Sequence, residues 1–146
     1  MRDLDRAKER LMTEGLSCVL CRGDRVLASS QTGIRPLMGW LDGETDLSGF
    51  SAADKIVGKA AAMLFSLMGV TAVYGMVMSR AGLDTLNRLG LEASYGSLVP
   101  GIVNRTGDGP CPMEATVMEL EDPVLAREAL LNKLAALAAA ARKARQ

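Results

Sequence analysis

Residues 51–78 read SAADKIVGKAAAMLFSLMGVTAVYGMVM, and this stretch decides the fold class. Its first part, Ser51–Met68, is predicted to be a helix ending at Gly69, because its apolar residues recur at intervals of three and four. Its second part, Thr71–Met78, is almost continuously apolar, which is typical of a central strand covered on both faces. We therefore expect the helix to lie on a sheet. The helical stripe consists of Ala53, Val57, Ala60, Leu64 and Leu67, widened by Ile56 and Met63.

The segments on either side extend this alternation of helices and strands. An apolar stretch at Leu98–Val103 is interrupted by Pro100 and is assigned to neither class. The remaining order predicts an α/β fold, a three-layer sandwich around one mixed central sheet. We expect one domain over residues 1–122 and a C-terminal helix, 123–146, packed on it. Helices are predicted at Asp3–Glu14, Ile34–Leu41, Arg80–Leu89 and Cys111–Leu120 and from Pro123 onward, and strands at Ser17–Cys21, Arg25–Ser29 and Leu91–Tyr95.

The charge balance argues against two classes of partner. Seventeen basic and seventeen acidic residues cancel, so no overall field attracts nucleic acid or an anionic membrane surface. The most apolar region, Ile56–Met78, is broken by Lys59, Ser66 and Gly69 and is not expected to span a membrane. The charged N-terminus lacks the apolar core of a secretory signal, and there are three cysteines, so we expect a cytoplasmic protein.

The absence of histidine limits the chemistry most strongly. It removes Ser–His and Cys–His nucleophilic pairs and every imidazole metal ligand. Cys18 and Cys21 have the C-x-x-C spacing of zinc and redox sites, but residues three apart on a strand point to opposite faces. We interpret them as ordinary buried cysteines and expect neither a metal site nor a cofactor.

Cys111 is the candidate nucleophile. It follows a polar loop with two glycines and precedes Pro112 at a predicted helix start, where backbone N–H groups stabilise a thiolate. Asn104 and Arg105 in the loop, and Glu114 in the helix, are candidate ligand contacts. The structural alternative is a cysteine that packs the loop at the N-cap position, and the sequence leaves both open.

A second candidate group begins the predicted helix at Ser51. Ser51 and Asp54 have the spacing of a capping box, whereas a functional site would add Lys55 and Lys59, four residues apart on one helix face, to attract a phosphate or carboxylate. Ser79 ends the central strand, at the edge where open α/β sheets bind ligands. A helix N-cap is an equally good interpretation of Ser79.

Three long segments resemble an uncharacterised family of small bacterial proteins, catalogued as domain of unknown function 1893. They are Asp46–Ala62, Leu98–Gly107 and Cys111–Glu114, and the resemblance extends over Leu11–Asp122. It implies a cytidine deaminase-like fold for this part of the chain. It implies architecture rather than activity, and it does not clearly include the helix after Pro123.

The zinc site of deaminases has no counterpart in the residues that the resemblance aligns with it. The His/Cys-x-Glu signature falls on Ser51–Asp54, where Asp54 would lie near the place of the catalytic acid. The P-C-x-x-C signature falls on Met78–Gly82, which contains no cysteine. Without these ligands no zinc hydroxide forms, so zinc-dependent deamination is excluded on chemical grounds.

Three functions therefore compete. The first, which we favour from the sequence, is a site for an unidentified small molecule, anionic and nucleotide-like, with Cys111 as the thiol and Asp54 as acid or base. The second is a non-catalytic binding or regulatory module, so the sequence does not decide whether the protein is an enzyme. The third is a homodimer formed through the last helix, whose stripe of Leu130, Leu134, Leu137 and Ala141 could instead pack on its own domain.

Overall fold

The computed structural model describes residues 1–43 and 45–145 and contains a five-stranded mixed sheet in the order β2-β1-β3-β4-β5. β1 pairs antiparallel with both β2 and β3, whereas β3, β4 and β5 run parallel. The predicted hairpin and central strand are confirmed. The strands are β1 (Cys18–Arg22), β2 (Arg25–Ser29), β3 (Ser51–Val57), β4 (Ala72–Ser79) and β5 (Glu92–Val99).

The prediction of one helix over Ser51–Met68 is wrong. Residues Ser51–Val57 form β3, and helix α3 begins only at Lys59 and runs to Met68. The apolar residues at the start of this stretch were interpreted as a helical stripe, but they belong to a strand buried on both sides. Ala52 and Ala53 are both fully buried, one on each face of the sheet. A strand covered on both faces has no alternation of apolar and polar residues, so its sequence merges with that of the buried helix that follows.

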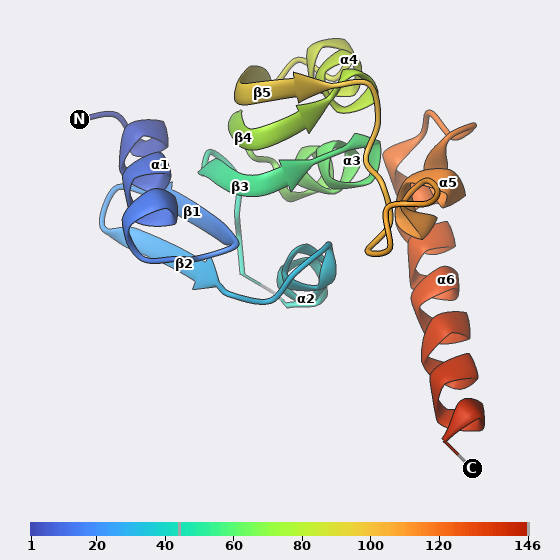
Figure 1. Ribbon diagram of the computed structural model, residues 1–146. Helices are drawn as coiled ribbons and strands as arrows, with labels where there is room; N and C mark the ends of the chain where they lie inside the picture. The colour runs from blue at the N-terminus through green and yellow to red at the C-terminus, as the bar shows by residue number, and fades with distance from the viewer. Residues whose placement is uncertain (44, 146) are drawn as a thin grey trace.

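Helices cover both faces of the sheet, which confirms the three-layer architecture (Figure 1). On one face lies α1 (Asp3–Thr13), whose Leu4, Ala7 and Leu11 pack on β1, β3 and β4. The other face carries the main core, to which α3 contributes Met63, Leu64, Phe65 and Met68 and α2 (Arg35–Asp42) contributes Leu37 and Met38. Helix α4 (Arg80–Arg88) lies beside α3 on this face.

The C-terminal third departs from the predictions in two places. β5 continues past Tyr95 to Val99, so it takes in the start of the segment that the sequence left unassigned. Helix α5 is short, Pro112–Val117, and α6 follows as a 22-residue helix, Pro123–Ala144, with Asp122 as its N-cap. Figure 1 shows α6 extending well beyond the sheet. Across residues 1–43 and 45–145, no helix has the length and apolar character needed to cross a membrane.

Candidate functional site

The carboxyl ends of three parallel strands meet at one edge of the sheet. There β3 leads through Gly58 directly into α3, and β4 leads directly into α4. β5 ends beside them at Val99. Two helix N-termini, each with N–H groups that have no acceptor within their own helix, therefore lie at the edge where open α/β sheets bind ligands.

The N-terminus of α3 is occupied by a carboxylate of the chain itself. Glu114, from α5, accepts a hydrogen bond from the Lys59 N–H at 2.7 Å and another from the Ala60 N–H at 2.8 Å. The glutamate is buried, and the positive end of the helix stabilises its charge. Gly58 makes room for it, since a Cβ there would lie 2.1 Å from Oε1 of Glu114. Glu114 thus fills the position that an anionic ligand of α3 would need.

The Lys59 side chain anchors the segment that follows α5. Its side chain is only 8% exposed, and Nζ donates to the carbonyl oxygen of Met118 at 2.8 Å and to Oε1 of Glu121 at 3.0 Å. Arg88 of α4 binds the same carboxylate through Oε2 at 3.1 Å. The pKa of Glu121 is lowered, first by the hydrogen bond from Lys59 and then by the charges of Lys59 and Arg88.

These contacts change the interpretation of Lys59. The predicted pair of lysines on one helix face is wrong, because Lys55 is exposed on β3 whereas Lys59 is buried at the first turn of α3. An open cavity of about 270 Å³ adjoins Lys59, but Asp84 and Glu121 also line it, so its charge is mixed. The sequence analysis did not identify Arg88 and Glu121 as partners at this edge. Glu121 pairs with Arg88, 33 residues away, and with Lys59, 62 residues away, and such distant pairs leave no local pattern in the sequence.

Ser79 caps α4. Its side chain accepts a hydrogen bond from the Gly82 N–H at 3.0 Å, and the residue is almost fully buried. The next residue, Arg80, lies beside a second open cavity of about 410 Å³, whose other lining residues are Leu98, Val99 and Pro100 at the end of β5. Arg80 has no salt-bridge partner among residues 1–43 and 45–145.

Asp54 lies in the middle of a strand and not at a helix start, so the predicted capping box of Ser51 and Asp54 is wrong. Its partner across the antiparallel pair is Cys18, and both residues are buried. Burial raises the pKa of Asp54 to about 7, against the lowering effect of hydrogen bonds from the Ile56 N–H, the Cys18 thiol and the Lys55 N–H. Burial and the neighbouring Asp54 raise the pKa of Cys18 well above its ordinary value.

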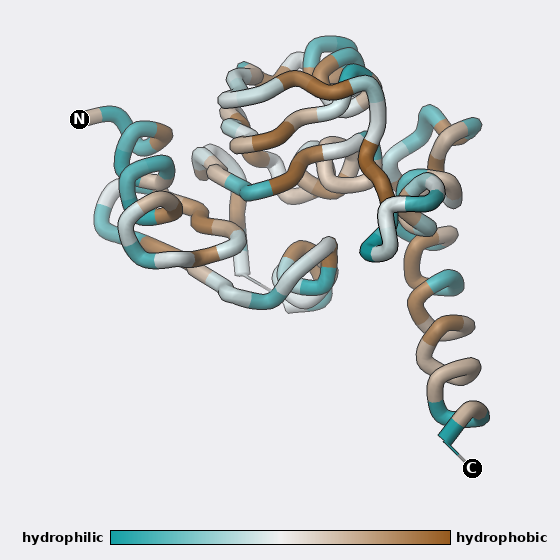
Figure 2. Tube along the Cα trace, in the orientation of Figure 1, coloured by the Kyte–Doolittle hydropathy of each residue, from teal (hydrophilic) through white to brown (hydrophobic). Residues whose placement is uncertain are grey.

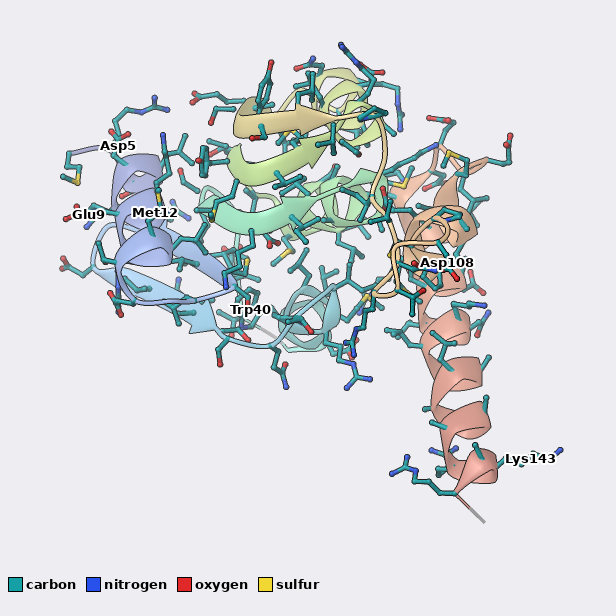
Figure 3. The ribbon with its side chains drawn as sticks, in the orientation of Figure 1. Asp5, Glu9, Met12, Trp40, Asp108 and Lys143 are labelled. Atoms are coloured by element: carbon teal, nitrogen blue, oxygen red, sulfur yellow. The ribbon has the colours of Figure 1, made fainter. Side chains whose placement is uncertain are left out.

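The loop before α5 is held by its own side chains. Oδ1 of Asn104 accepts hydrogen bonds from the Thr106 hydroxyl and the Asp108 N–H, and Nδ2 donates to Asp108 at 2.9 Å. The hydroxyl of Thr106 and then the amide of Asn104 lower the pKa of Asp108, which Figure 3 labels in this loop. Arg105 is exposed, and Cys111 is partly exposed at the N-cap of α5 without a capping hydrogen bond from its side chain.

The predicted site residues therefore fall into separate groups. Lys59 and Glu114 meet at the start of α3, and Ser79 lies at the neighbouring helix start. Asp54 is enclosed within the sheet, and neither Asp54 nor Cys111 lines the two cavities described above. Within the described residues, no cluster of three or more cysteine, aspartate or glutamate side chains is arranged to hold a metal ion.

Comparison with known proteins gives one strong similarity. A family model described as a domain of unknown function (DUF1893) matches residues 6–134. The crystal structure of a DUF1893 family protein from Thermotoga maritima superposes with a TM-score of 0.82 at 28% identity, covering 91% of each chain. No curated protein matches.

Two weaker structural matches are to dCMP deaminase from the cyanophage S-TIM5, one in apo form and one in complex with dCMP and dUMP. Both have a TM-score of 0.44 and cover 63% of this chain and 92% of the deaminase, at 14% and 11% identity.

We predict that Glu114→Ala lowers the free energy of unfolding by roughly 2–4 kcal/mol, because it leaves the N–H groups of Lys59 and Ala60 buried without an acceptor. Glu114→Gln keeps one acceptor oxygen and should lose less. Denaturation in urea measures both. Glu119→Ala, on the exposed side of the same segment, is the matched control and should change stability by less than about 0.5 kcal/mol. Equal effects at positions 114 and 119 would contradict the anchoring role.

We predict that Asp54 makes the protein less stable as pH rises from about 4 to about 7. The carboxyl stays protonated in the folded state up to about pH 7, whereas in the unfolded chain it ionises near its ordinary pKa of 3.8. Over this range the folded state binds more protons, so its stability falls with pH, by roughly 4 kcal/mol in total from this group.

Asp54→Asn should remove this contribution from the slope of unfolding free energy against pH. The exposed hairpin residue Asp24 provides the control variant Asp24→Asn, which should keep the wild-type slope. Urea denaturation at several pH values between 4 and 8 measures all three proteins. Parallel profiles for the wild type and Asp54→Asn would show that Asp54 is not the group responsible.

Proposed function

The chain belongs to the DUF1893 family, and we propose that it is a non-catalytic module that binds a small anionic molecule at the carboxyl ends of β4 and β5. The observation that carries this proposal is Arg80, which lies beside the 410 Å³ cavity at the first residue of α4 and has no salt-bridge partner in the described part of the chain.

The position of Arg80 favours an anion. A cation at the N-terminus of a helix opposes the helix dipole, which favours negative charge there. An anionic group bound beside Arg80 would receive charge-assisted hydrogen bonds from the guanidinium and would also be stabilised by the helix end. One bound charge would thus interact with both the guanidinium and the helix end, neither of which is paired with a carboxylate in the part of the chain that the structure describes.

The rest of the cavity suggests the kind of anion. Leu98, Val99 and Pro100 present an apolar wall, and the volume lies within the range of small-molecule sites. A ligand with a charged end and an apolar or aromatic body fits this combination better than an inorganic ion. A nucleoside monophosphate has both parts, as do aromatic carboxylates.

Catalysis is the alternative, and it would need Cys111 and Asp54 at the ligand. Asp54 is enclosed beside Cys18, and Cys111 precedes a helix of six residues, outside the lining of the Arg80 cavity. Glu114 is committed to the N–H groups of α3. The groups capable of acid–base or nucleophilic chemistry are therefore apart from the proposed ligand position, which favours binding without reaction.

We predict that nucleoside 5′-monophosphates raise the melting temperature in a saturable way, and that inorganic phosphate does so more weakly because it lacks the apolar body. Arg80→Gln should abolish the effect, since the ligand loses its guanidinium partner. Thermal-shift titration measures this.

Arg105→Gln and Cys111→Ser are the matched controls, and both should bind like the wild type. An unchanged titration for Arg80→Gln would refute the proposed site. Loss of binding only in Cys111→Ser would instead place the ligand at the loop and favour the thiol-based alternative.

A further inference from the structure

The second half of α6 is a helix without a partner. Only Ala126 and Leu130 of this helix are buried, and every residue from Ala135 to Arg145 is exposed. Figure 3 places Lys143 near the far end of the helix, away from the sheet. Isolated helices of about a dozen residues are marginal in water even when rich in alanine, so this projection lacks the packing that usually supports a helix.

The exposed sequence is also unusually apolar. Residues 134–141 read LAALAAAA and contain no charge, and Figure 2 shows apolar colours along the second half of α6 until its hydrophilic last turn. Leu131 and Leu137 are 41% and 42% exposed, and Val124 is 61% exposed. An apolar surface of this kind marks a contact with another molecule.

Two stripes run along α6, and they differ in what they face. Ala126 and Leu130 lie on the stripe that packs on the domain. Roughly opposite, a second stripe faces away from the domain, with its members spaced three or four residues apart along one helix face. It consists of Val124, Glu128, Leu131, Ala135, Ala139 and Arg142.

The outer stripe is complementary to itself in one orientation. When two copies are laid antiparallel about Ala135, Glu128 of each lies opposite Arg142 of the other, and Leu131 lies opposite the small side chain of Ala139. A parallel pair would place Glu128 against Glu128 and Arg142 against Arg142, which is repulsive. The alanines at the centre let the two helices approach closely.

We propose that a second copy of this chain covers the outer stripe, so that the protein forms a twofold dimer through antiparallel α6 helices. The interface is isologous, with two symmetry-related Glu128–Arg142 pairs flanking an apolar centre. This assignment is independent of the Arg80 ligand site, which lies at the sheet edge.

Sedimentation velocity over a wide range of concentrations tests the dimer. We expect the wild-type mass to double as concentration rises. Glu128→Arg should raise the dimer dissociation constant about tenfold by turning both pairs repulsive, and the double variant Glu128→Arg/Arg142→Glu should restore it. Glu9→Arg, an exposed charge reversal on α1, should associate like the wild type.

Leu131→Glu should abolish association while leaving the melting temperature of the monomer unchanged, because the side chain does not belong to the core. A wild type that stays monomeric at every concentration overturns the proposal and leaves the stripe to a different partner. A dimer that Glu128→Arg and Leu131→Glu do not weaken also overturns it, since its interface would lie elsewhere.

Discussion

The carboxylate of Glu114 at the N-terminus of α3 is the contact on which the C-terminal part of the molecule depends. A buried carboxylate is costly unless its charge is compensated, and here two backbone N–H groups and the end of a helix compensate it. The contact also satisfies buried donors at the start of α3 that the helix itself cannot pair. Because Gly58 has no side chain, the two groups can approach to hydrogen-bonding distance. The Lys59 ammonium then holds the following segment, and α6 starts from that anchored position.

The contacts of Glu114 and Lys59 decide which part of the sheet edge is open to a ligand. At the end of β3, the carboxylate of Glu114 occupies the N-terminus of α3, and the nearby cations Lys59 and Arg88 are paired with Glu121. At the end of β4, the N–H of Gly82 is capped by Ser79, whereas the guanidinium of Arg80 has no carboxylate partner within the described residues and lies beside the cavity. We therefore place the proposed ligand site on the β4–β5 side of the edge, away from Asp54 and Cys111. Separation of the binding cation from the reactive groups is the physical reason to favour a binding module over an enzyme.

The two halves of the long C-terminal helix α6 differ in their packing. Its first three turns are supported by α3 and α5, and its later turns by nothing within the described chain. A helix with two apolar stripes needs two surfaces, and the domain supplies only one. The charges at Glu128 and Arg142 bracket the second stripe in a way that orients a partner, which a purely apolar stripe would not do.

Much of the architecture was predictable from local signals. The amphipathic period of α1, the turn between β1 and β2, the unbroken apolar run of β4 and the Asp122-Pro123 start of α6 all depend on residues close in sequence, and each appears as expected. The lack of histidine likewise limits the chemistry whatever the fold.

The strand at Ser51–Val57 could not be recognised, because burial on both faces erases the alternation that identifies a strand. The role of Asp54 depends on Cys18, which lies on another strand. The roles of Lys59 and Glu114 depend on partners 54 to 62 positions away in the sequence. Burial and charge compensation of this kind arise only when the chain is packed, and so only the tertiary structure could decide them.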